Sequence, residues 1–359
     1  MMKTDLVLVG DAGGTNTTLA VLRYRRHAFE VLYLRQVPSR TITNFPIVVQ
    51  QFLNDCQRDK NIMPLRAGFG AAGPVSGKRD FCKITHLPWS VDAAAIQKKT
   101  GLKSVLILND FEAIAYGIEV RDHHSFLSIK QGSSQPRQTK IILGAGTDLG
   151  KSILVWDNSV RHYKPLPSEG GHGDISIQYP EEYRLLQFIQ SKTKSSVAWG
   201  DILSGRGIST IYRFLGKEKV YMRNSYAQKI QQSGYQPSVI AAYKKNDPRS
   251  RDTFALFLRF YARCARNLAL DVMALGGVYI AGGIAAKNPE IFQWPEFNAE
   301  FLVSNRQQNL LLKIPIFLIN DYLISLYGAA QAVLLQEEKV FSPLYRKALW
   351  IVQKRIELV

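Results

Sequence analysis

The sequence has few cysteines, no long apolar run and a shortage of acidic residues. Its 359 residues include three cysteines, Cys56, Cys82 and Cys264, with no CxxC pair. This spacing excludes a disulfide framework and a cysteine zinc site, so we expect all three in the core. No apolar run approaches the roughly 20 residues that a membrane span needs. The first run, "LVLV", is strand-sized and ends at Gly10, which is not the pattern of a signal peptide.

The charge is strongly basic, because 46 Lys and Arg outnumber 29 Asp and Glu to give a net charge of +17. A basic surface attracts polyanions, so a nucleic-acid or membrane partner is one interpretation. The basic residues are scattered along the chain, which favours a solvated surface with no specific nucleic-acid partner and no membrane contact. We expect a cytoplasmic globular protein, long enough for two domains.

The stretch "LVLVGDAGGTNTTLAVLR", residues 6–23, places glycines and a carboxylate between two runs typical of strands. It matches neither the P-loop nor the dinucleotide-binding pattern. Glycines let backbone N–H groups approach a phosphate, Asp11 can enter a magnesium shell, and Thr15 and Asn16 add donors. The alternative is a plain hairpin whose glycines serve only the turn.

The stretch "KIILGAGTDLGKSILVW", residues 140–156, repeats the pattern of strand, glycine turn and strand. Two such hairpins indicate two related half-molecules, each with a phosphate-binding turn. A third segment, "GGVYIAGGIAAKNPEIF", sets Gly282 and Gly283 between a strand and the start of a helix, where adenosine can lie against bare backbone. Together the three segments predict a nucleotide held between two α/β domains.

A group that activates a phosphate acceptor is expected in "SVLILNDFEAIAYGIEV", where an apolar strand is followed by Asn109 and Asp110. Catalytic groups of α/β folds favour the carboxyl ends of strands. Asp110 can therefore act as a general base towards a substrate hydroxyl. The alternative role is that of a helix N-cap, which Asn and Asp often fill.

The stretch "PLPSEGGHGDISI" contains Glu169 and His172 at a Glu-x-x-His spacing. On a helix this spacing can ligate a metal, but the two intervening glycines make a helix unfavourable. We interpret it as a loop that offers hydrogen-bonding groups to a polyhydroxylated ligand. A solvated loop with a structural histidine is the alternative.

The order of these segments along the chain, and their approximate spacing, also match a known pattern. The motifs "GDAGGTN", "LILNDFEA", "GAGTDLG", "PSEGGH", "ILSGRG" and "GGVYIAGGI" resemble those of bacterial glucokinases, from about residue 5 to about residue 335. The resemblance implies an α/β, two-domain actin-like ATPase (ribonuclease H-like) fold with a nucleotide and sugar cleft between the domains. Residues 1–110 plus 325–359 would form the smaller α/β domain, and residues 111–324 the larger.

The resemblance implies ATP-dependent phosphorylation of glucose at its 6-hydroxyl, the entry step of glycolysis, with Mg²⁺. Asp110 would be the catalytic base. The sugar hydroxyls would be bound by Asn109, Glu169 and His172. The ATP phosphates and magnesium would be bound by Asp11, Gly13, Gly14, Thr15, Asn16, Gly146 and Thr147, with Asp11 serving the metal. Gly282 and Gly283 would approach the adenosine, and we expect a homodimer.

Three positions depart from the glucokinase pattern. Asp148 replaces a glycine, His86 replaces an asparagine, and Gly200 stands where a sugar-binding glutamate is usual. These departures keep open a sugar-binding regulatory protein of the same fold with little or no kinase activity. The last 20 or so residues exceed the pattern and predict an amphipathic basic helix, packed on the first domain or on a second subunit.

Overall fold

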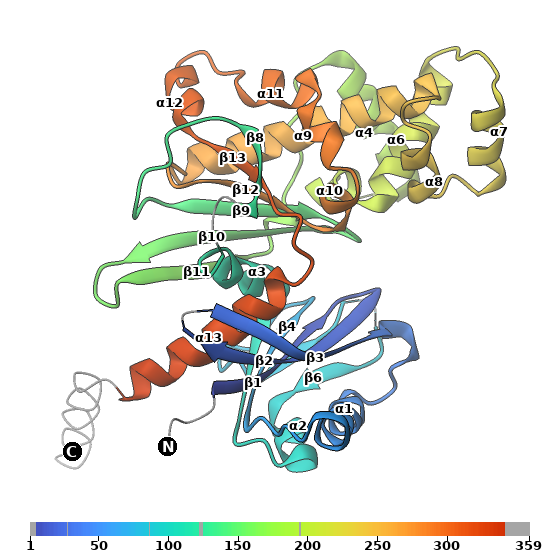
Figure 1. The fold of residues 1–359 in the computed structure, drawn as a ribbon. Coiled ribbons are helices and arrows are strands. Elements are labelled where there is room, and N and C mark those ends of the chain that lie inside the picture. The colour runs from blue at the N-terminus through green and yellow to red at the C-terminus, as the bar shows by residue number, and fades with distance from the viewer. Residues whose placement is uncertain (1–4, 27, 86, 122–124, 194, 342–359) are drawn as a thin grey trace. The chain divides into compact units, whose positions relative to one another are not determined.

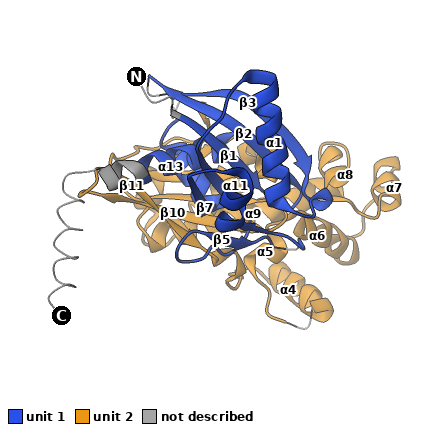
Figure 2. Cartoon of the chain, turned by 90° about the horizontal axis from the view of Figure 1, so that it is seen from below, with its two compact units in different colours: residues 1–122, 323–359 blue, residues 123–322 orange. Residues whose placement is uncertain are grey.

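The chain divides into two compact units, residues 1–122 with 323–359 (unit 1) and residues 123–322 (unit 2), coloured separately in Figure 2. The computed structural model describes residues 5–26, 28–85, 87–121, 125–193 and 195–341. His86 and the expected C-terminal helix after residue 341 lie outside the described residues. The sequence predicted a first boundary at residue 110. Here helix α3 (Asp110–Ile118) belongs to unit 1, because it packs against other elements of that unit.

Unit 1 is a twisted sheet with helices on both faces (Figure 1). Its strands are β1 (Asp5–Ala12), β2 (Asn16–Arg25), β3 (Ala28–Pro38), β4 (Arg66–Ala71), β5 (Phe81–Lys83), β6 (Ser90–Asp92) and β7 (Ser104–Asn109). Besides α3, its helices are α1 (Phe45–Lys60), α2 (Ala93–Thr100), α13 (Ile324–Phe341) and the 3-10 turn η1 (Ser39–Thr41). The main sheet has the order β3-β2-β1-β4-β7, while β5 and β6 pair separately.

Alternation along the strands of unit 1 divides its apolar residues between two cores. Leu8 belongs to the cluster that includes Phe52 of α1, whereas Val7 and Val9 belong to the cluster that includes Ala329 of α13. Successive side chains of a strand point to opposite faces, so this sheet is buried on both. The fully buried strand-like run that the sequence showed at β1 follows from that arrangement.

Unit 2 is a second α/β layer structure. Its strands are β8 (Leu127–Lys130), β9 (Lys140–Ala145), β10 (Leu149–Asp157), β11 (His162–Ser168), β12 (Gly277–Ala281) and β13 (Ile316–Leu318). Its helices are α4 (Pro180–Thr193), α5 (Trp199–Ile202), α6 (Gly205–Glu218), α7 (Ser225–Gln232), α8 (Pro237–Ala242), α9 (Pro248–Asp271), α10 (Gly283–Lys287), α11 (Pro295–Phe301) and α12 (Gln308–Lys313), with 3-10 turns η3 (Gly170–His172) and η4 (Pro289–Gln293). The sheet order is β11-β10-β9-β12-β13-β8.

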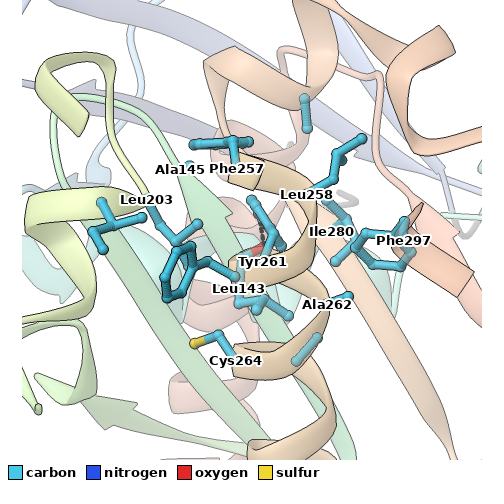
Figure 3. Close-up of a cluster of buried hydrophobic side chains, with 14 of the residues drawn as sticks. Leu143, Ala145, Leu203, Phe257, Leu258, Tyr261, Ala262, Cys264, Ile280 and Phe297 are labelled. Carbon is cyan, nitrogen blue, oxygen red and sulfur yellow. Dashed lines mark hydrogen bonds between the residues drawn. The ribbon is translucent and has the colours of Figure 1, made fainter. Parts of the chain in front are cut away.

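Helix α9 crosses the core of unit 2, where it packs against β9 and β12 (Figure 3). Its Tyr261 hydroxyl donates a 3.1 Å hydrogen bond to the backbone oxygen of Leu143. Such a bond satisfies a buried polar group that burial would otherwise penalise. Cys264 lies in the same core, and it, Cys56 and Cys82 are all free and buried, as the sequence predicted.

Two arginines of α9, Arg263 and Arg266, are buried rather than solvated. Arg263 is fully buried, and its guanidinium pairs with Glu182 (Nη1 to Oε2, 2.6 Å) and Glu300 (Nε to Oε1, 2.9 Å). Arg266 also contacts Glu300. A buried ion needs such partners to offset its lost hydration. Both faces of α9 are therefore packed, one by apolar and one by ion-pair contacts.

Among the described residues, no helix is long and apolar enough to cross a membrane.

Candidate functional site

The acidic residues predicted for catalysis and metal binding lie at one edge of the unit 1 sheet. Strands β1, β4 and β7 run parallel, with Asp11 beside Gly70 and Ala71 beside Asn109. Asp11 therefore lies at the carboxyl end of β1, and Asp110 directly follows that of β7, two strand spacings away, about 10 Å. We call Asp11, Asn109 and Asp110 the acidic edge. The fold brings together residues that lie far apart in the sequence.

Asp11 is fixed by a contact that the sequence did not reveal. Its Oδ2 accepts a 2.6 Å hydrogen bond from the hydroxyl of Ser325, at the start of α13. Burial raises the pKa of Asp11, and the Ser325 hydrogen bond opposes that shift by favouring the carboxylate. Within the described residues of unit 1, Oδ1 has no hydrogen-bond partner. A half-buried carboxylate with one available oxygen fits magnesium, which binds few protein ligands and keeps several waters.

The first glycine turn joins β1 to β2 as an antiparallel hairpin. Gly13 N donates to Asn16 O at 3.2 Å, and Ser39 Oγ donates to Gly13 O at 2.6 Å. Thr15 and Asn16 are exposed, and a Cβ on Gly14 would meet nothing within 4 Å. The turn therefore presents open backbone next to Asp11. Ser39 supports it from behind, and its distance along the chain hid that role from the sequence.

The two candidate roles of Asp110 are separated by the structure. The N-cap of α3 is Asn109, whose Oδ1 accepts from Phe111 N at 3.0 Å, while Asp110 is the first helical residue. Asn109 also donates from Nδ2 to Gly73 O at 3.3 Å. Asp110 Oδ1 accepts from Phe111 N as well. Since Asn109 already caps the helix, the half-buried Asp110 is not needed for capping.

A second carboxylate lies one residue beyond Phe111. Glu112 is 2% exposed, and its side chain pairs with the guanidinium of Arg79. Burial raises the pKa of Glu112, and the charge of Arg79 opposes that shift. No sequence motif marks either residue. Their pairing anchors the start of α3 to the segment between β4 and β5 and so supports the position of Asp110.

The second glycine turn and the glycine pair meet in unit 2. Strands β9 and β12 are parallel, with Ala281 beside Gly144. Gly282 follows with a φ of +87°, and a Cβ there would lie 2.6 Å from Ala145 O. Glycine is therefore required by both conformation and space. A Cβ on Gly283 would meet nothing within 4 Å, so that backbone is open to a ligand.

The Glu169–His172 segment is not an α-helix: Gly170–His172 form the short 3-10 turn η3, and Glu169 is its N-cap residue. His172 Nε2 lies 3.6 Å from Glu169 Oε2, and the two side chains are 64% and 63% exposed. A Cβ on Gly171 would lie 1.9 Å from Leu149 O, so the glycine allows the segment to pack on β10 directly after the second turn. Glu169 and His172 thus project polar groups from a supported backbone, and no metal-binding cluster is found among the described residues.

The predicted residues fall into two groups, one in each unit. Unit 1 holds the acidic edge and the first turn, with Asp11, Gly13, Gly14, Thr15, Asn16, Asn109 and Asp110. Unit 2 holds the second turn, the glycine pair and the polar 3-10 turn, with Gly146, Thr147, Glu169, His172, Gly282 and Gly283. Carboxylates at strand ends and glycine turns with open backbone are groups that suit phosphoryl transfer.

This fold is that of sugar kinases of the two-domain, actin-like class. A glucokinase structure from an Antarctic psychrotroph has a TM-score of 0.75 with 23% identity, covering 92% of this chain and 99% of its own. A ROK family glucokinase from Streptomyces griseus, in complex with glucose and AMPPNP, has a TM-score of 0.63 with 17% identity, covering 91% and 99%.

The sequence comparisons are more specific than the fold. The family model for glucokinase matches residues 8–336. The glucokinase of Nostoc punctiforme is 32% identical over 340 residues, which cover 90% of this chain and 98% of that protein. The chain belongs to the glucokinase family, as its motifs predicted.

Proposed function

We propose that this chain transfers the γ-phosphoryl group of ATP to the 6-hydroxyl of glucose, with Asp110 as the catalytic base. Membership of the glucokinase family supports the overall reaction. The observation that carries the assignment of the base is the position of Asp110, at the carboxyl edge of the sheet that also holds Asp11, on a helix that Asn109 already caps.

In this reaction the Asp110 carboxylate accepts the proton of the sugar 6-hydroxyl. At the same time the oxygen of that hydroxyl bonds to the γ-phosphorus of ATP. The bond between that phosphorus and the bridging oxygen of ADP breaks, so the products are glucose 6-phosphate and ADP. A positioned carboxylate is sufficient, because phosphoryl transfer depends mainly on alignment and charge neutralisation. Asn109, Glu169 and His172 bind other hydroxyls of the sugar and so align the reacting one.

The nucleotide is held by the two glycine turns and the glycine pair. The open backbone at Gly13, Gly14 and Gly146 borders the phosphates, and the side chains of Thr15, Asn16 and Thr147 bind them. The N–H groups of Gly13 and Gly146 hold their own turns together, donating to Asn16 O at 3.2 Å and to Asp148 O at 2.9 Å. Gly282 and Gly283 accommodate the adenosine. Magnesium, when bound, neutralises charge on the β- and γ-phosphates, and Asp11 is the residue that would hold it.

A homodimer and residence in the cytoplasm remain predictions of the sequence. A homodimer is checked by the molar mass in solution, measured by light scattering. Neither prediction is needed for the chemistry proposed above.

Coupled measurement of ADP release tests the function, with a panel of hexoses, ATP and magnesium. We expect sugar-dependent turnover with glucose. A sugar-binding regulatory protein would instead bind glucose, as seen by calorimetry, without releasing ADP above the sugar-free rate. That second outcome would refute the kinase assignment while leaving the fold and family unchanged.

A further inference from the structure

The side chain of Asp148 connects the second glycine turn to the start of α6. Its Oδ1 accepts from Leu149 N at 2.8 Å, and its Oδ2 lies 3.2 Å from Nη2 of Arg206. The carboxylate fills the space over Gly200, where a Cβ would lie 1.8 Å from Oδ1. Two departures from the glucokinase pattern, at 148 and 200, are therefore one structural feature, since the missing side chain makes room for the added one.

Arg206 is the cation that this arrangement orients. It lies in the first turn of α6 and is 51% exposed. Its Nη2 also lies 3.7 Å from Oδ1 of Asp201, so two carboxylates hold one nitrogen of the guanidinium. Among the described residues, its Nε and Nη1 atoms have no hydrogen-bond partner. A guanidinium carries five donors in a planar fork, so most of them remain available.

The backbone ties Arg206 to the second glycine turn. Gly205 N, one residue before Arg206, donates to Gly146 O at 3.0 Å. Ser204 caps α6 by accepting from Gly207 N at 3.1 Å. The start of α6 is thus hydrogen-bonded to the turn assigned to the nucleotide phosphates, and Arg206 is fixed beside it by contacts within unit 2.

We propose that Arg206 binds the phosphate chain of the nucleotide and that Asp148 is the residue that positions it. This inference rests on the proposed function, which places the phosphates at the Gly146 turn. A guanidinium suits this task because its free edge can donate two parallel hydrogen bonds to phosphate oxygens. Holding Nη2 in advance reduces the side-chain freedom that would otherwise be lost on binding.

The test measures binding of the ATP analogue AMPPNP with magnesium by calorimetry, and the ATP KM in the coupled assay. Arg206→Ala is expected to weaken analogue binding about tenfold or more, as for loss of a hydrogen bond to a charged group. Arg206→Lys should recover part of the loss, because it keeps the charge without the fork. The matched control is Arg213→Ala, on the same helix, whose guanidinium bonds to Gly234 O. Unchanged binding in Arg206→Ala overturns the proposal.

The same substitution made in the Asp148→Asn protein distinguishes two roles of Arg206: contact with the phosphates, or only neutralisation of the charge of Asp148. If Arg206 binds phosphate, Arg206→Ala still weakens AMPPNP in the Asp148→Asn protein, although less than in the wild type, because the uncharged amide positions the guanidinium less firmly. If the double variant binds like the wild type, Arg206 only neutralises Asp148 and the proposal is wrong. Glucose turnover is measured separately. If the wild type does not turn over glucose but still binds AMPPNP in a way that depends on Arg206, the proposed function is rejected and this inference stands.

Discussion

The acidic edge of unit 1 and the glycine-rich segments of unit 2 position their site residues in different ways. Asp11 lies at the end of β1 and Asp110 directly after β7, and their carboxylates accept hydrogen bonds from Ser325 and Phe111. In unit 2, Gly171 and Gly282 leave no room for a Cβ, and the side chains of Glu169 and His172 are largely exposed. The described departures from the family pattern, Asp148 and Gly200, both lie in unit 2. Both of these departures therefore lie outside the acidic edge and beside the second glycine turn, which we propose holds the phosphates.

The largest expected effect is at the acidic edge. Asp110→Ala should lower kcat for glucose phosphorylation by about 100-fold or more, because a general base acts in the transition state. Glucose affinity, measured by calorimetry, should change little. The matched control is Asp92→Ala, which removes the N-cap of α2 in the same unit. It should lower the free energy of unfolding by about 1 kcal/mol without reducing kcat. Equal kcat losses in both variants would mean that Asp110 acts only through its helix.

The glycine pair provides a comparison between neighbours. Gly282→Ala should destabilise the protein by about 1–3 kcal/mol, because φ is +87° and the Cβ would lie 2.6 Å from Ala145 O. Gly283→Ala should leave the melting temperature near that of the wild type, since its Cβ enters open space. If Gly283 borders the adenosine, that variant should still raise the ATP KM. Equal melting temperatures for the two variants would contradict the requirement for glycine at 282.

The Gly200 site tests the interdependence within unit 2. Gly200→Glu places its Cβ 1.8 Å from Asp148 Oδ1, so the carboxylate of Asp148 must move and its contact with Arg206 is lost. We expect the free energy of unfolding to fall by about 1 kcal/mol. Denaturant titration measures this loss. The double variant Asp148→Gly with Gly200→Glu should recover most of it. Gly77→Ala, into open space, is the control. Strict additivity of the two substitutions would show that the sites are independent.

Local patterns were enough to predict the two hairpins and the strand before Asp110. Each rests on a short apolar run next to glycine or a polar residue, and the structure has β1–β2, β9–β10 and β7 at these places. The family resemblance added the fold and the reaction. The order of the motifs, rather than any one turn, carried that prediction.

Contacts between distant residues could not be predicted in the same way. Arg263 and Glu182 are 81 positions apart, and Ser325 and Asp11 are 314 apart. The helical spacing of Arg263 and Arg266 places them on one face of α9, but it does not show that both are buried. Likewise, the sequence shows Asp148 and Gly200 as two separate departures. Only the structure shows that they are one feature, because a Cβ added to Gly200 would lie 1.8 Å from Asp148 Oδ1.

The smallest effect concerns the hydroxyl that contacts Asp11. Burial raises the pKa of Asp11, so its carboxylate is protonated, and its metal binding weakened, at a higher pH than for an exposed aspartate. The Ser325 hydrogen bond favours the ionised form and lowers that pKa. Ser325→Ala should therefore raise it further, and activity should begin to fall at a higher pH as the solution is acidified.

Profiles of kcat/KM against pH, at limiting magnesium, measure that acidic limb. The control is Ser39→Ala, since the Ser39 hydroxyl donates to the backbone oxygen of Gly13 and not to a carboxylate. It should lower activity at all pH values without moving the limb. A limb that stays in place in Ser325→Ala, or moves to lower pH, would remove Asp11 as the group that titrates. Saturating magnesium should reduce the shift in Ser325→Ala, because a bound cation favours the same ionised form of Asp11.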